Sequence, residues 1–220
     1  MSMGQRIVLL HGVATTAAIW DRVIASLGVL GMRDVVAIQR PCTGSLTDEV
    51  EAIAPLAKGA LVVGQSGGAT LVLALACSGH PIAGGIAHEP AVGSLLPALL
   101  APAAAAFAER GVDGLGSTLY GPTWSSDMAG GDLSAIPREL AMFRSFEPAP
   151  VPAGQGRVLV TVGAMSPPIR HEAADALHTR LGYQVATIEG ASHFAAWDAP
   201  TAFAETVAAH LERNGADYGT

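Results

Sequence analysis

The sequence contains little of what several classes of protein require. Only two of its 220 residues are cysteine, Cys42 and Cys77, and they form no Cys-x-x-Cys pair. A disulfide framework or a zinc–thiolate site needs more cysteines at closer spacing. We therefore expect two ordinary thiols, no bound metal and a reducing, cytoplasmic environment.

Basic residues are also scarce, since 12 Lys and Arg stand against 19 Asp and Glu, and the formal net charge is -7. Nucleic acids and anionic membrane surfaces are bound by clustered Lys and Arg. The chain has no apolar run of about 18 residues, the length that spans a bilayer. Because its first residues lead directly into a strand-like run, we expect no signal peptide. We expect no nucleic acid and no membrane as partners, but a small-molecule substrate.

Apolar residues, in contrast, make up 50% of the chain, and only 14% of it is charged. Short runs rich in Val, Ile and Leu are typical of parallel strands that are buried on both faces. Helix-compatible stretches separate most of these runs. The alternation predicts one α/β domain over residues 1–220, with a predominantly parallel sheet flanked by helices. The predicted strands are 6–11, 34–39, 60–64, 82–88, 157–163 and 183–189, and the predicted helices are 18–30, 46–56, 69–78, 170–181 and 201–213.

The alternation stops over residues 91–150, a segment rich in Pro, Gly and Ala. This segment has no convincing strand, but it has helical pieces near 95–110, 112–119 and 136–146. Insertions of this length between sheet strands usually serve a function. We predict a small helical cap over the carboxyl edge of the sheet, with a flap that does not contact the substrate as the alternative.

The strongest chemical signal is a Gly-x-Ser-x-Gly pattern at residues 64–68, with Ser66 at its centre. The pattern lies between a predicted strand and a predicted helix, the setting in which it is informative. A sharp turn there strains the serine backbone and requires small neighbours, and the following helix N-terminus stabilises an oxyanion. We predict that Ser66 is a nucleophile. A phosphate-binding loop is the alternative, although neither of its usual glycine patterns is present.

His11 ends the first predicted strand, Gly12 and Val13 follow it, and these three residues complete a resemblance to the α/β-hydrolase superfamily. In that family a His-Gly pair ends the strand before the first helix, and the N–H of the next residue faces the substrate oxygen. The resemblance implies an oxyanion hole formed by the backbone N–H groups of Val13 and Gly67, aimed before the reaction begins. It extends over almost the whole chain and implies no cofactor.

A serine hydroxyl needs a nearby base with a pKa near 7, and histidine suits this task. Of the seven histidines, only His193 lies in a loop directly after the last predicted strand. Residues 190–193 resemble the Gly-x-x-His of the family before its final helix. We predict His193 as the base that activates Ser66.

The imidazole in turn needs a carboxylate to hold its tautomer. Many family members carry an aspartate after the penultimate strand, but residues 164–168 read Ala-Met-Ser-Pro-Pro, without a carboxylate. Certain haloalkane dehalogenases and fungal resorcylic-acid lactonases instead place a glutamate after the nucleophile helix, at the end of the next strand. Glu89 matches that position, so the resemblance implies a triad of Ser66, Glu89 and His193. The alternatives are a structural role for Glu89, a degraded triad, and Glu147 as the acid.

Together these residues imply a serine hydrolase that cleaves a carboxylic ester or lactone of a neutral, largely apolar small molecule through an acyl-enzyme. A thioesterase or carbon–carbon bond hydrolase would use the same triad. A cofactor-free lyase or oxygenase, or a non-catalytic ligand binder, can also use this scaffold. Apolar side chains in the cap and near the triad loops are candidates to line the substrate pocket. They are Trp124, Met128, Met165, Phe194 and Trp197.

Overall fold

The sheet at the centre of the fold has six strands in the order β2-β1-β3-β4-β5-β6. The computed structural model describes residues 5–130 and 132–217, and each neighbouring pair of strands in this part is parallel. The predicted α/β fold is confirmed, and each predicted strand overlaps an observed one. The strands are Ile7–Leu10 (β1), Val35–Ile38 (β2), Leu61–Gln65 (β3), Gly84–His88 (β4), Val158–Gly163 (β5) and Gln184–Ile188 (β6).

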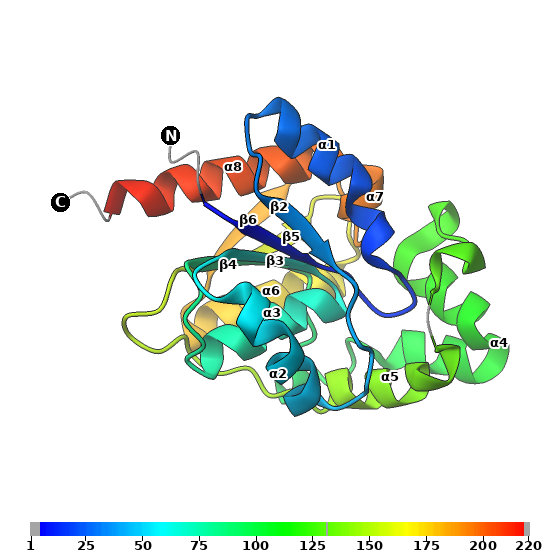
Figure 1. Cartoon of the computed structure of the whole chain (residues 1–220). Coiled ribbons are helices and arrows are strands. Elements are labelled where there is room, and N and C mark those ends of the chain that lie inside the picture. Colours follow the sequence, from blue (N-terminus) through cyan, green and yellow to red (C-terminus); the bar gives the residue numbers. More distant parts are fainter. Residues whose placement is uncertain (1–4, 131, 218–220) are drawn as a thin grey trace.

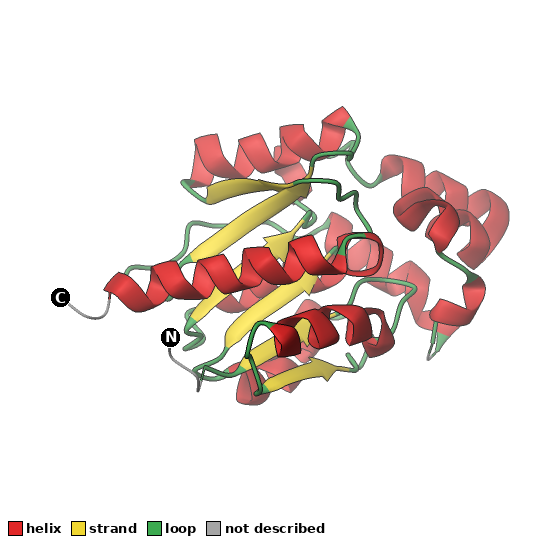
Figure 2. Cartoon of the chain, turned by 90° about the horizontal axis from the view of Figure 1, so that it is seen from above, coloured by secondary structure: helices red, strands yellow, loops and turns green. Residues whose placement is uncertain are grey.

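Helices cover both faces of the sheet, as Figures 1 and 2 show. One face carries α1 (Asp21–Val29) and the long α8 (Pro200–Asp217), which pack against each other. The other carries α2 (Leu46–Ala57), α3 (Gly67–Cys77) and α6 (Pro168–Leu181). The first turn of the predicted helix 18–30 is a separate 3₁₀ turn, η1 (Ala17–Trp20), and a short helix, α7 (Ala195–Asp198), precedes α8.

Helices on both faces of the sheet explain why its inner strands are apolar. β1, β3, β4 and β5 are buried along their whole length, because helices leave these inner strands no solvent-exposed face. β2 and β6, at the two edges, are partly exposed. Since all the strands run in the same direction, the loops that follow β1, β3, β4, β5 and β6 lie together at the carboxyl ends of the strands.

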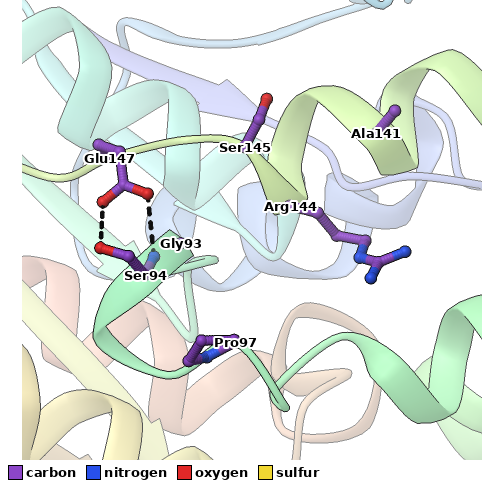
Figure 3. A pocket seen from close by; sticks show the side chains of 7 residues that line it. All are labelled: Gly93, Ser94, Pro97, Ala141, Arg144, Ser145 and Glu147. Atoms are coloured by element: carbon purple, nitrogen blue, oxygen red, sulfur yellow. Dashed lines mark hydrogen bonds between the residues drawn. The ribbon is translucent and has the colours of Figure 1, made fainter.

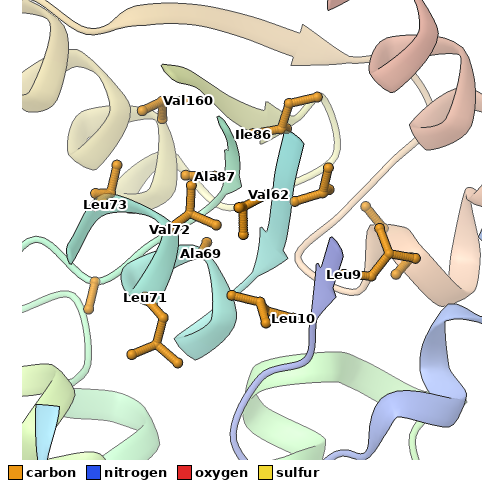
Figure 4. Packing of buried hydrophobic residues seen from close by; sticks show 14 of the residues in the cluster. Leu9, Leu10, Val62, Ala69, Leu71, Val72, Leu73, Ile86, Ala87 and Val160 are labelled. Atoms are coloured by element: carbon orange, nitrogen blue, oxygen red, sulfur yellow. The ribbon is translucent and has the colours of Figure 1, made fainter. Parts of the chain in front are cut away.

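Buried apolar side chains pack together between α3 and the central strands (Figure 4). Every residue of α3 from Gly67 to Ala76 is buried, so this helix is apolar all round instead of amphipathic. Gly85 of β4 lets the helix approach closely, because a Cβ there would lie 2.7 Å from Cγ1 of Val72. The cluster around α3 includes Leu9, Leu10, Val62, Ala69, Leu71, Val72, Leu73, Ile86, Ala87 and Val160. This packing holds the first turn of α3 rigidly against the sheet.

The segment between β4 and β5 has, in its described residues, helices and 3₁₀ turns but no strand. Its helices α4 (Ala101–Tyr120) and α5 (Ile136–Arg144) lie beyond the carboxyl ends of the strands (Figure 1). α4 is broken at Gly111, with φ 61° and ψ -144°, a backbone conformation that favours glycine. The two predicted helical pieces meet at this break, although the first begins only at residue 101. The 3₁₀ turns are η2 (Gly93–Leu95), η3 (Gly121–Thr123), η4 (Ser126–Met128) and η5 (Leu133–Ala135).

Residue 131 of the predicted cap lies outside the described residues. Within them, none of the helices combines the length and the apolar character that crossing a membrane requires. The cap as a separate functional unit stays a prediction.

Candidate active site

Ser66 lies at the sharp turn between β3 and α3. Its backbone has φ 57° and ψ -122°, a conformation that costs a residue with a side chain about 1–3 kcal/mol. The Ser66 N–H donates to the carbonyl of His88 at 2.9 Å, which ties this turn to the end of β4. The residue is 8% exposed, so its hydroxyl lies in a largely covered site.

The glycines of the motif are required by close contacts around this turn. A Cβ at Gly64 would overlap with the backbone of Gly68, and a Cβ at Gly68 would overlap with the carbonyl of Leu10. A Cβ at Gly67 would lie 2.6 Å from the ring of Phe143. Larger residues at positions 64 and 68 would therefore separate α3 from the sheet, and one at position 67 would displace the ring of Phe143, which explains why the pattern is rich in glycine.

Three side chains from different loops form a continuous chain of hydrogen bonds. Nε2 of His193 is 3.1 Å from Oγ of Ser66, and Nδ1 of His193 is 2.8 Å from Oε2 of Glu89. Because a carboxylate only accepts, Nδ1 carries the proton and Nε2 is free to accept from the Ser66 hydroxyl. All three residues are buried. The structure thus brings together the residues predicted as nucleophile, base and acid.

Glu89 is held by donors on both carboxylate oxygens. Oε1 accepts from the N–H of Gly163 at 2.9 Å and from the hydroxyl of Ser166. Oε2 faces His193 and also Nε of Arg170, at 3.5 Å. Ser166 lies in the loop where many family members carry the aspartate, and here it serves as a hydrogen-bond donor to a glutamate from another strand. Neither Ser166 nor Arg170 belongs to a recognisable motif, so sequence reasoning missed both.

The ionisation of the triad follows from its surroundings. Burial by itself raises the pKa of the Glu89 carboxyl, but the hydrogen bond from His193 and the positive charge of Arg170 outweigh it and hold that pKa well below its usual range. Burial lowers the pKa of His193 to about 4, the charge of Arg170 adds to this, and Glu89 opposes it. At neutral pH the pair is therefore a carboxylate and a neutral imidazole.

A second histidine, His88, fixes the loop that carries His193. Its Nε2 donates to the carbonyl of Ser192 at 3.0 Å, and its Nδ1 lies 3.1 Å from Oγ1 of Thr161. Burial lowers the pKa of His88, so the ring is neutral and the Thr161 hydroxyl is the donor to Nδ1. Its place directly before Glu89, at the end of a buried strand, is the only sequence signal for this role.

The two predicted oxyanion-hole donors flank Ser66. The Gly67 N–H lies at the start of α3, where a helix offers its N–H groups no internal acceptor. The Val13 N–H donates no hydrogen bond within residues 5–130 and 132–217. The loop of Val13 lies directly beside the nucleophile, because a Cβ on Gly12 would lie 2.9 Å from Cβ of Ser66. Neither N–H group has an acceptor among the described residues, and their role as oxyanion-hole donors stays a prediction.

A family model for the alpha/beta hydrolase family matches residues 7–206. The chain belongs to the alpha/beta hydrolase family. Membership in this family supports hydrolase activity in general but does not identify the substrate. None of the curated proteins compared with the chain matches it.

Solved structures show how widely the fold of this alpha/beta hydrolase is shared. An enol-lactonase from Burkholderia xenovorans has a TM-score of 0.72 at 18% identity, covering 95% of this chain and 92% of that one. A lipase-esterase related protein from Clostridium acetobutylicum has a TM-score of 0.73 at 12% identity, covering 95% and 96%. A carboxylesterase from Bacillus subtilis has a TM-score of 0.61 at 18% identity, covering 96% and 85%. At these identities the likeness shows the fold alone.

The insertion of this alpha/beta hydrolase covers the triad directly. The ring of Tyr120 stacks on the imidazole of His193, with centroids 5.6 Å apart and planes at 12°. The Tyr120 hydroxyl donates to the carbonyl of Val13 at 2.6 Å, and Nε1 of Trp124 donates to the carbonyl of Ala14 at 2.9 Å. Sequence reasoning did not select Tyr120, because it belongs to no motif and only the fold brings it to the triad.

The five predicted pocket residues have separate surroundings. Trp124 is buried against the Ala14 carbonyl, and Phe194 is fully buried. The ring of Phe194 packs 6.1 Å from that of Trp197. Met128 is partly buried against the core, whereas Met165 is 73% exposed. The five side chains thus differ widely in burial, and their contact with a substrate stays a prediction.

A cavity of about 470 Å³ lies between η2 and the last turns of α5 (Figure 3). Its lining includes Glu147, which accepts from the Ser94 N–H at 3.0 Å and from the Ser94 hydroxyl at 2.6 Å. The triad does not line this cavity, and Glu147 is bound to Ser94 instead of the imidazole. The lining residues are Gly93, Ser94, Pro97, Ala141, Arg144, Ser145 and Glu147.

Metal-binding potential is low in the described part of the chain, where no group of three or more His, Cys, Asp or Glu side chains could hold an ion. Cys42 and Cys77 are both free thiols.

Proposed function

We propose that this alpha/beta hydrolase cleaves a carboxylic ester or lactone of a neutral, largely apolar small molecule through an acyl-enzyme. One observation carries the proposal: the hydrogen-bonded chain from Ser66 through His193 to Glu89, beside two free backbone N–H groups. His193 takes the hydroxyl proton as Oγ attacks the carbonyl carbon, and Val13 and Gly67 hold the oxyanion. The imidazolium then protonates the leaving alcohol, and a water activated by His193 hydrolyses the acyl-enzyme.

Charge pairing around the site favours a neutral substrate. Nη1 of Arg40 lies 3.0 Å from Oε2 of Glu49, and its Nη2 lies 2.6 Å from Oε1 of Glu139. Arg170 is paired with Glu89. A substrate carboxylate would have to compete with these buried partners for the guanidinium groups, which is costly in a desolvated site.

Covalent labelling tests the proposal. We expect a fluorophosphonate to add once per chain, with the adduct on the Ser66 peptide, and p-nitrophenyl acetate turnover to fall in proportion to labelling. In this step the serine oxygen displaces fluoride from phosphorus, and His193 accepts the hydroxyl proton. Intact-mass and peptide mass spectrometry measure the adduct, with heat-denatured protein as the control. Labelling elsewhere, or turnover that survives complete labelling of Ser66, would disprove the proposed nucleophile.

The pH profile provides a second prediction. The neutral form of His193 is the base, and burial holds its pKa in the folded protein below the ordinary 6.5. The kcat/KM for p-nitrophenyl acetate is therefore expected to stay constant as the pH falls through 6.5 and to decline only near the lowered pKa. An acid limb at or above pH 6.5 would contradict this assignment.

Stability must be measured over the same pH range. The unfolded chain binds a proton at the ordinary histidine pKa of 6.5, whereas the folded protein binds it only near the lowered pKa of about 4. The unfolded state therefore holds more protons between these values, and the free energy of unfolding decreases as the pH falls. Thermal unfolding at each pH separates protonation of His193 from loss of the fold.

A further inference from the structure

Arg40, which follows β2, lies buried beneath the loop that carries Val13. Its side chain is 0% exposed. Nε donates to the carbonyl of His11 at 2.8 Å, and Nη2 donates to the carbonyl of Gly12 at 3.3 Å. One guanidinium group thus binds the two backbone carbonyls that directly precede the predicted oxyanion donor.

Arg40 also sets the tautomer of His11. The backbone N–H of Arg40 donates to Nε2 of that ring at 3.2 Å, so Nδ1 carries the proton and donates to the Gly12 carbonyl at 2.9 Å. Burial and the charge of Arg40 lower the pKa of His11 to about 3, so the ring is neutral as this arrangement requires. The hydroxyl of Thr15 donates to the same carbonyl at 3.1 Å.

These contacts determine the direction of the Val13 N–H. The Gly12 carbonyl and the Val13 N–H belong to one planar trans peptide, so they point in opposite directions. Three donors, from Arg40, His11 and Thr15, bind the carbonyl on one side. The N–H is consequently aimed to the other side, and rotating the peptide would break all three hydrogen bonds.

One carboxylate from α2 and one from the insertion hold the guanidinium in place. Nη1 donates to Glu49 of α2 at 3.0 Å, and Nη2 donates to Glu139 of α5 at 2.6 Å. Both carboxylates are buried. The planar fork of an arginine can bind two carboxylates and two carbonyls at once, which a lysine ammonium cannot do. The position of α5 is thereby connected to the Gly12–Val13 peptide through a single side chain.

We propose that Arg40 is a positioning residue that orients the Val13 N–H into the oxyanion hole. Glu139 couples this orientation to the position of the insertion. The inference rests on the proposed function, because an oxyanion hole acts only where a carbonyl is attacked. Arg40 acts entirely through the Gly12–Val13 peptide. Its loss therefore reduces stabilisation of the oxyanion and leaves binding of the neutral ester nearly unchanged.

The variant Arg40→Lys tests this role. We expect kcat for p-nitrophenyl acetate to fall at least roughly tenfold, part of the hundredfold or more that a lost oxyanion donor costs, while KM changes by less than about threefold. An aryl trifluoromethyl ketone is attacked by Ser66 Oγ at its carbonyl carbon, the hydroxyl proton passes to Nε2 of His193, and the carbonyl oxygen becomes an oxyanion. This inhibitor is expected to bind more weakly by the same factor. Matching losses in kcat and inhibitor affinity are the result that a merely structural role would not produce.

Two further variants keep the test decisive if Arg40→Lys does not fold. Glu139→Ala removes only the link to the insertion and leaves Arg40 paired with Glu49, so kcat and inhibitor affinity are expected to fall together, by at least about threefold. Val207 is fully buried on the inner face of α8, so Val207→Ala creates a cavity there and is expected to lower stability without changing kcat. It is the matched control for destabilisation alone.

The outcomes separate the two proposals. If turnover depends on Ser66 but kcat and inhibitor affinity of Arg40→Lys and Glu139→Ala stay within twofold of wild type, the positioning role is wrong and the proposed function stands. A loss of kcat without a loss of inhibitor affinity overturns the positioning role as well. If the wild type shows no Ser66-dependent turnover, the proposed function fails. Crystal structures then decide the positioning role, since a rotated Gly12–Val13 peptide in Arg40→Lys supports it and an unchanged peptide overturns it.

Discussion

Replacing Ser66 with Ala, or His193 with Ala, is expected to lower kcat for p-nitrophenyl acetate by roughly 10⁴-fold or more. Replacing both is expected to cost little beyond either change alone. The reason is geometric: Nε2 of His193 lies 3.1 Å from Oγ of Ser66, and each group is useful only through the other. Without the imidazole the hydroxyl keeps its proton, and without the hydroxyl the imidazole has no nucleophile to activate.

Steady-state kinetics of the two single variants and the double variant measure this coupling. The residual activity above the uncatalysed rate is expected to come from the oxyanion hole and from substrate binding. His171→Ala on α6 is the control for a histidine change, because His171 lies on a helix outside the hydrogen-bonded chain. Losses that multiply in the double variant would show that Ser66 and His193 act independently, and the acyl-enzyme mechanism would then be wrong.

Glu89→Gln is expected to reduce kcat by roughly 10⁴-fold, the size of effect seen when the carboxylate of a triad becomes an amide. Oε1 of Glu89 accepts from the Gly163 N–H and the Ser166 hydroxyl, so the amide oxygen of the glutamine takes that position. The NH₂ group then faces Nδ1 of His193 and donates to it. The imidazole is forced into the tautomer with a proton on Nε2, which cannot accept the proton of Ser66.

The control for this prediction is Glu147→Gln, a change to the carboxylate that sequence reasoning left as the alternative acid. Glu147 is bound to Ser94, so kcat is expected to stay within about twofold of wild type. The pH profile of kcat/KM in both variants, and thermal unfolding of each, accompany the rates. Near-full activity in Glu89→Gln would reject Glu89 as the acid, and loss of activity in Glu147→Gln would indicate that the acid had been misassigned.

Much of the fold could be predicted because local sequence reports burial on both faces. Continuous Val, Ile and Leu runs such as residues 61–63 occur where helices cover both sides of a parallel strand. The break in α4 could be predicted from the backbone freedom of glycine. Gly111 lies between two predicted helical pieces and adopts a backbone conformation that favours glycine. The 3₁₀ turns between α4 and α5 were not predicted, because single turns carry no periodicity.

The candidate site also has features that the sequence predicts and features that depend on packing. Ser66 and the loop of Val13 belong to contiguous motifs, and the glycines beside them indicate the tight backbone turns that these motifs need. His193 and Glu89 were located by their places after strands, because parallel strands bring such positions to one edge. Their actual distances, and the donors that hold the Glu89 carboxylate, depend on how the loops pack.

The sequence by itself determined an α/β fold with a parallel sheet, and a glycine-lined turn at Ser66 that follows one of its strands. Only the tertiary structure decided that Tyr120 stacks on His193 and that Arg40 links Glu139 to the Gly12 carbonyl. The physical reason is the range of the interactions. Periodicity and glycine requirements act between neighbours in the chain, whereas these contacts join residues 28, 73 and 99 positions apart. The two longer ones exist only once the insertion packs against the rest of the fold.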